Sequence, residues 1–134
     1  MSAAASFRIE KDLLGTLEVP TDAYYGIQTL RAVQNFRLSG VPLSHYPKLV
    51  IALAMVKQAA ADANRKLGHL SAAKHTAITT ACARIIQGEF HDQFVVDMIQ
   101  GGAGTSTNMN ANEVIANVAL EAMGFEKGEY QHLH

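Results

Sequence analysis

The stretch from Gln100 to Asn117 changes along its length from a glycine-rich loop to an apolar helix. Gly101, Gly102 and Gly104 lack a Cβ, so the backbone there can adopt positive φ and approach another group closely. Side chains with hydroxyl or amide groups follow at the expected helix start: Thr105, Ser106, Thr107, Asn108, Asn110 and Asn112. The first N–H groups of a helix have no partner within it and carry the positive end of its dipole, which suits this stretch to bind a carboxylate or phosphate. A helix cap formed by Thr105 or Ser106 would explain the same residues, and this pattern alone leaves both interpretations open.

The apolar spacing elsewhere predicts a mainly α-helical domain preceded by an irregular or short-β N-terminal arm. Residues 7–20 mix apolar and charged side chains between turn signals, which is typical of extended segments that lie against a larger body. Four helices are expected after them, over residues 27–36, 47–67, 71–87 and about 110–123. The last of these is apolar on several sides, so we expect it to be buried on more than one face.

Two of these helices carry apolar residues at helical spacing, which predicts the face that each one buries. In the helix over residues 47–67 this stripe consists of Leu49, Leu53, Val56, Ala60, Ala63 and Leu67. In the next helix, which Ser71 is expected to cap, the inner face consists of Ala77, Ile78, Ala81, Cys82, Ile85 and Ile86. Cys82 is therefore interpreted as a small core side chain, because nothing near it in the sequence suggests an activated thiolate.

Composition narrows the class of protein further. A length of 134 residues suits one domain, and 49% hydrophobic with 17% charged residues is an ordinary globular balance, apart from residues 1–6, which we expect to form a disordered tail. A net charge of -1 argues against a nucleic-acid partner, and the absence of a long apolar run argues against a membrane partner. The single cysteine excludes an internal disulfide and fits a reducing compartment, so we expect a cytoplasmic protein.

The remaining polar residues do not predict a metal or cofactor site. His69, His75 and His91 are too scattered to form a ligand set, and no Cys or His pair has ligand spacing. Asp92 and Asp97 are not expected to form a catalytic pair, and we expect solvent or backbone partners for both. No lysine follows the glycines as a phosphate-binding loop requires, which argues against a nucleotide.

Three separated stretches, residues 8–32, 100–117 and 127–134, together resemble the aspartase/fumarase superfamily of lyases, in the same order and at the expected separations. Within the superfamily, Tyr24-Tyr25-Gly26 and the segment 101–106 are more similar to aspartases than to fumarases. The likeness covers nearly all of the chain after the expected tail.

This resemblance implies that residues 7–134 form the N-terminal helical domain of a longer homotetrameric enzyme, whose active sites combine segments from three subunits. It also implies reversible elimination of ammonia from L-aspartate, a small dicarboxylate, to give fumarate without a cofactor or metal. Thr105 is the residue expected to contact the substrate, while Ser106 and Asn108 shape its pocket. A second anion site is implied at His134. The serine base of the family lies further downstream, so no catalytic residue is expected in this chain.

Two alternatives remain open on the sequence. One is a class II fumarase, which hydrates fumarate to malate. The other is a helical interaction domain without chemistry, in which the segment 101–108 only begins a helix. Turnover of aspartate against malate separates the two enzymes, and binding of a dicarboxylate near Thr105 separates both from the interaction domain.

Overall fold

The computed structural model describes residues 6–100 and 102–134. Within them, two strands and four α-helices follow one another: β1 (Phe7–Asp12), β2 (Gly15–Pro20), α1 (Ile27–Asn35), α2 (Pro47–Lys66), α3 (Ala72–Ile86) and α4 (Thr105–Ala122). Short 3-10 helices lie at Leu43–His45, His91–Gln93 and Gly102–Gly104. The expected disordered tail lies outside the described residues, apart from Ser6, whose carbonyl accepts a hydrogen bond from the Thr21 N–H. The mainly α-helical class is confirmed.

The N-terminal arm is a two-stranded antiparallel hairpin, which confirms the short-β expectation for this segment. Its register pairs Phe7 with Pro20 and Asp12 with Gly15. Arg8 ties the hairpin to the segment that follows it, because its guanidinium donates to the carbonyls of Pro20, Ala23 and Tyr25 at 2.8, 2.8 and 2.7 Å. The hairpin therefore reaches α1 in a defined orientation.

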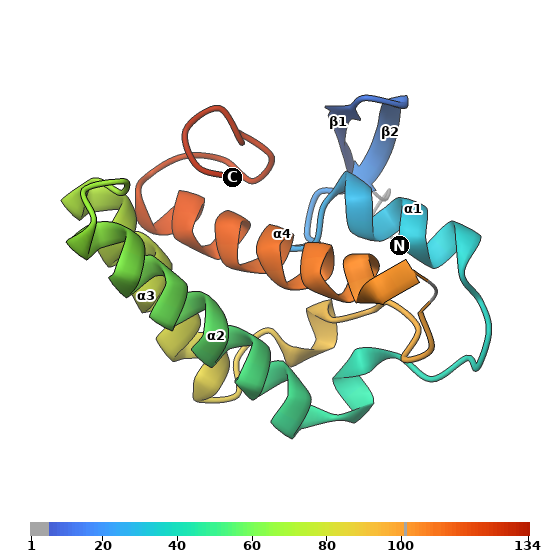
Figure 1. The fold of residues 1–134 in the computed structure, drawn as a ribbon. Helices are drawn as coiled ribbons and strands as arrows, with labels where there is room; N and C mark the ends of the chain where they lie inside the picture. Colours follow the sequence, from blue (N-terminus) through green and yellow to red (C-terminus); the bar gives the residue numbers. More distant parts are fainter. Residues whose placement is uncertain (1–5, 101) are drawn as a thin grey trace, which may run out of the picture.

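Helix α4 is the central element of the molecule. Figure 1 shows it running between α2 and α3 on one side and α1 with the hairpin on the other, and α4 contacts all three helices. Its most deeply buried apolar residues are at most 1% exposed: Ala111, Val114, Val118, Ala119 and Leu120. The prediction that this helix is buried on more than one face is confirmed.

The prediction for the inner face of α2 is wrong. The buried face is displaced around the helix by about one residue from the predicted face. The residues of α2 that are buried are Val50, Ala54 and Ala61. In the predicted stripe, Leu49, Val56 and Leu67 are instead 43%, 64% and 69% exposed. Small and apolar residues occur around most of this helix, so their spacing does not select one face. Packing against α3 and α4 makes that selection.

Helix α3 agrees with its prediction in both its cap and its inner face. The Ser71 side chain accepts a hydrogen bond from the Lys74 N–H at 3.3 Å, so it is the N-cap. Cys82 is fully buried in the core, and burial raises the pKa of its thiol to about 11. An unreactive, structural cysteine is the result.

The start of α4 differs from its prediction. The helix begins at Thr105 rather than near Asn110, and its N-cap is Gly104, at φ 73° and ψ 23°. Ala103 also has a left-handed backbone, at φ 59° and ψ 16°. Because the cap is a glycine, the alternative in which Thr105 or Ser106 caps the helix is wrong, and both residues belong to the first helical turn.

Among the described residues, no helix is both long enough and apolar enough to span a membrane. The 20 residues of α2 include several charged side chains, which accounts for this result in the longest helix.

Candidate functional site

The start of α4 is exposed on the surface, and its side chains fall on two sides of the helix. Thr105 and Asn108 are exposed, whereas Ser106 is half-buried. Helical spacing places Thr105 in line with Met109 and Asn112, at i, i+4 and i+7, with Asn108 beside them. Ser106 lies on a different side of α4, so the structure brings two of the three predicted substrate-binding residues together and separates the third.

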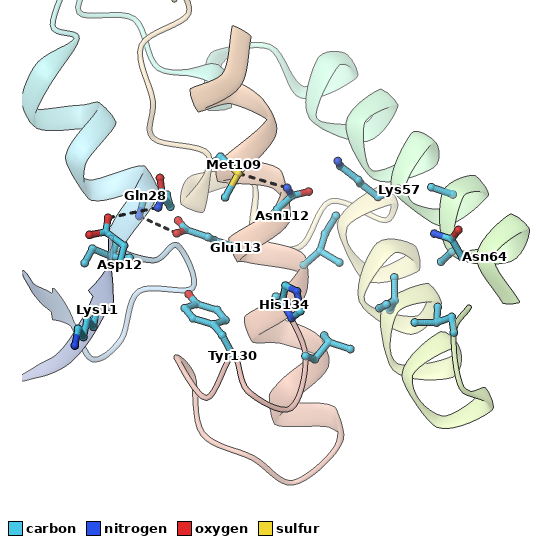
Figure 2. A pocket seen from close by; sticks show the side chains of 18 residues that line it. Lys11, Asp12, Gln28, Lys57, Asn64, Met109, Asn112, Glu113, Tyr130 and His134 are labelled. Carbon is cyan, nitrogen blue, oxygen red and sulfur yellow. Dashed lines mark hydrogen bonds between the residues drawn. The ribbon is translucent and has the colours of Figure 1, made fainter. Parts of the chain in front are cut away.

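The side of α4 that carries Met109 and Asn112 forms one wall of a cavity of about 500 Å³. Residues of β1, α1, α2, α3 and the C-terminal segment form the other walls, and Figure 2 shows the polar ones among them. Its polar lining consists of Lys11, Asp12, Gln28, Lys57, Asn64, Asn112, Glu113, Tyr130 and His134. The other lining residues are apolar, so polar and apolar side chains both face the cavity.

His134 lies in this cavity together with Leu133, and Figure 2 shows it beside α4 and below Asn112. The lining does not include Thr105, Ser106 or Asn108, so the predicted second anion site and the predicted substrate site are separate places on the molecule. Lys57 connects them, because it lines the cavity and its ammonium donates to Oδ1 of Asn108 at 2.5 Å.

An adjacent side of α4, which meets the cavity at Glu113, carries a row of buried polar residues that the sequence prediction missed. Ser106 is followed on this side by Asn110, Glu113 and Asn117, at i+4, i+7 and i+11, and these three are 0%, 5% and 0% exposed. Asn110 donates to the carbonyl of Gln93 at 2.9 Å. The signal was present in the sequence as polar residues at helical spacing within an apolar helix.

Glu113 is the most informative member of this row, because its carboxylate receives the start of α1. It accepts hydrogen bonds from the backbone N–H groups of Gly26, Gln28 and Thr29 at 2.9, 2.8 and 3.0 Å. Burial raises the pKa of Glu113, while these hydrogen bonds act in the opposite direction. A carboxylate from one helix thus satisfies the unpaired N–H groups of another, which fixes α1 against α4.

The segment that leads into the site is held by Asp97. Its carboxylate accepts hydrogen bonds from the Ser39 hydroxyl at 2.7 Å and from the N–H groups of Leu38, Ser39 and Gly40 at 3.1, 2.8 and 2.9 Å. The Ser39 hydroxyl, together with backbone N–H groups, holds the pKa of Asp97 well below its usual range. The expectation of backbone partners is confirmed for Asp97, whereas Asp92 is exposed and accepts from the Gln93 side chain at 3.0 Å.

The model of a family described as "Lyase" matches residues 15–134, and the chain belongs to this family. Among curated relatives, it is 84% identical over 134 residues to the aspartate ammonia-lyase of Pseudomonas aeruginosa, covering 100% of this chain and 28% of that relative. It is 56% identical over 127 residues to the aspartate ammonia-lyase of Helicobacter pylori strain J99, covering 95% of this chain and 27% of that relative.

Solved structures agree with these relatives. A fumarate lyase:delta crystallin from Brucella melitensis in native form is 62% identical, with a TM-score of 0.93 over 95% of this chain and 29% of that one. A recombinant class II fumarase from Schistosoma mansoni is 36% identical, with a TM-score of 0.85 over 92% of this chain and 26% of that one. The chain spans little more than a quarter of the length of the curated relatives that it matches.

Proposed function

We propose that this chain is the N-terminal domain, residues 7–134, of a longer ammonia-lyase that reversibly eliminates ammonia from L-aspartate to give fumarate. The observation that carries the proposal is the 84% identity, over the entire chain, to a protein named aspartate ammonia-lyase. The chain is also 56% identical to a relative of the same name in a different genus. The identity to the class II fumarase is lower, at 36%.

In this proposal the start of α4 binds a carboxylate of the substrate. Thr105 contacts the substrate through its hydroxyl, while Asn108 and Ser106 shape the pocket. Removal of the proton beside the distal carboxylate places a second negative charge on that group, so donors must already point toward it. The left-handed Gly104 supports this role, because a Cβ added there would have no atom of the other described residues within 4 Å, its chain neighbours and local helix backbone aside.

The rest of the active site would come from other segments. The serine base belongs to a part of the enzyme that is not in this chain, and the active site is completed in a homotetramer by segments from other subunits. His134 contributes to a second anion site, which the cavity of about 500 Å³ around it can accommodate. We place the enzyme in the cytoplasm, because the single cysteine of this chain is a buried free thiol, as a reducing compartment allows.

Substitution of Thr105 in the full-length enzyme tests the proposed contact. We expect Thr105→Ala to lower kcat/KM for L-aspartate by about 10²–10³, the usual cost of one donor to a developing negative charge, with the melting temperature unchanged. Formation of fumarate is followed by its ultraviolet absorbance. Thr80→Ala, at an exposed threonine of α3, is the matched control. Wild-type turnover by the Thr105 variant would remove this residue from the mechanism.

A class II fumarase is the second candidate, and the match to the Schistosoma mansoni enzyme favours it. The same assay with L-malate distinguishes the two, since the preferred substrate has the higher kcat/KM. We expect aspartate to be preferred. A full-length protein that acts on neither substrate would instead support a helical interaction domain.

A further inference from the structure

Lys57 of α2 is half-buried and lines the cavity described above. Val50, Ala54 and Ala61 form the buried face of this helix, and residue 57 continues their spacing at i, i+4, i+7 and i+11. Lysine is among the residues least often buried unless it is paired. Within the described residues, however, none of the ion pairs involves Lys57. The ammonium of this half-buried lysine is instead bonded to a neutral group.

The partner of the Lys57 ammonium is the side-chain amide of Asn108, in the first turns of α4. The distance from Nζ to Oδ1 is 2.5 Å, and Figure 2 shows Lys57 reaching from α2 toward α4. An ammonium carries donors and no acceptor, so it can bond only the oxygen of an amide. As long as this bond holds, the Asn108 amide has one orientation, with its NH₂ group directed away from Lys57.

We propose that Lys57 is a positioning residue of the carboxylate-binding site at the start of α4. It holds the amide oxygen of Asn108, so that the NH₂ group of Asn108 faces the substrate carboxylate. In the flipped orientation the amide oxygen would face that carboxylate, and two acceptors would repel each other. This inference rests on the proposed function, because it assigns the ligand of Asn108 as a substrate carboxylate.

The test is a double-mutant cycle in the full-length enzyme, with aspartate kinetics and the dissociation constant of succinate as readouts. We expect Lys57→Met to lower kcat/KM about tenfold, as when a residue that orients a ligand-binding group is lost. Asn108→Ala should lower kcat/KM about 10²-fold, as expected when a hydrogen-bond donor to the substrate is lost. The double variant should have the same kcat/KM and the same dissociation constant for succinate as Asn108→Ala alone, because Lys57 then has no amide to orient. A purely structural lysine would not show this coupling in succinate binding.

Three further variants complete the design. Lys57→Arg keeps the charge and the donors, and we expect it to recover most of the loss. Lys57→Ala repeats the deletion with a residue that the alanine-rich α2 accommodates, so that a folding defect in the methionine variant would not decide the result. Lys66→Met, at an exposed lysine of the same helix, is the matched control, and its kcat/KM and succinate dissociation constant should equal those of the wild type.

The outcomes separate the two proposals. Wild-type kcat/KM in both Lys57→Met and Lys57→Ala, or losses that add in the double variant, would overturn the role of Lys57 and leave the proposed function intact. A wild-type enzyme that neither releases ammonia from aspartate nor binds succinate would overturn the proposed function, and the role of Lys57 with it.

Discussion

At the scale of single residues, the junction between the hairpin and α1 depends on one glycine. The N–H of Gly26 donates to Glu113, and the next N–H, of Ile27, donates to Glu10 at 2.8 Å. A Cβ on Gly26 would lie 2.2 Å from the Tyr130 hydroxyl, 2.7 Å from Oε2 of Glu10 and 2.9 Å from Cδ of Glu113. The glycine is therefore required for close approach, because two carboxylates and a phenol converge on the start of one helix.

We expect Gly26→Ala to lower the free energy of unfolding of the 134-residue chain by about 1–3 kcal/mol, the usual cost of overpacking a filled site. Tyr130→Phe removes the closest of the three atoms and also deletes the hydrogen bond from Asn117 at 3.0 Å. The double variant should lose less free energy of unfolding than the sum of the two single losses, because Tyr130→Phe removes the atom that the new Cβ would meet. Urea unfolding followed by circular dichroism measures all three. Strictly additive losses would contradict the steric explanation.

At the scale of elements, the start of α4 is set from both sides. Downstream, Asn110 and Glu113 attach the helix to the Gln93 carbonyl and to α1. Upstream, Asp97 attaches the preceding segment to residues 38–40, and the Met98 N–H donates to the Val41 carbonyl at 2.8 Å. The proposed carboxylate-binding turn thus lies between two anchored segments, as electrostatic preorganisation requires.

The anchor at Asp97 predicts a dependence of stability on pH. Because the folded-state pKa of Asp97 lies below its ordinary value, the folded chain binds fewer protons than the unfolded chain in this range. Its contribution is fully present above about pH 4 and is lost as the pH falls toward the folded-state pKa. Asp97→Asn should therefore lower the urea midpoint at neutral pH, and its deficit relative to the wild type should shrink as the pH falls below about 4.

Urea midpoints of the chain between neutral pH and strongly acidic pH measure this effect. Asp92→Asn, at an exposed aspartate in the same segment, is the matched control and should follow the wild type at each pH. A deficit in Asp97→Asn that stays constant with pH would show that the carboxylate charge is not what anchors the segment.

At the scale of the whole molecule, the chain is a scaffold that presents the start of α4. Figure 1 shows the C-terminal segment returning alongside α4, and Leu133 within it is only 4% exposed. The N–H of Gly128 donates to the Asn117 side chain at 2.8 Å, which connects this segment to the buried polar row of α4. Hairpin, α1 and C-terminal segment therefore converge on one side of the central helix.

Because the proposed mechanism takes its base from a segment outside this chain, we expect the isolated 134-residue chain to form no fumarate from aspartate. Absorbance of fumarate measured with the purified chain at high concentration tests this, with the full-length enzyme under the same conditions as the positive control. Turnover by the chain alone would contradict the assignment of the base to another segment.

The predictions from sequence succeeded where the signal is local. Ser71 caps α3 because a hydroxyl next to free N–H groups is a short-range interaction, and Cys82 is buried because it continues an apolar face. They failed for the face of α2, where Leu49 and Val56 are exposed, because apolar residues on most sides of a helix leave its rotation to its neighbours. Resemblance predicts Thr105, Ser106 and Asn108 as site residues, which stays a prediction, whereas nothing local indicated that Lys57 bonds Asn108.

The sequence by itself determined the class of fold, the approximate limits of α1, α2 and α3, and the glycine-to-threonine turn at the proposed site, because propensity, capping and periodicity act over a few residues. Only the tertiary structure decided which sides of α2 and α4 are buried and which groups meet across the molecule. Glu113 reaches the start of α1, and Lys57 reaches Asn108, from helices far apart in the chain. Contacts of this kind depend on how helices pack, and packing is a property of the whole chain.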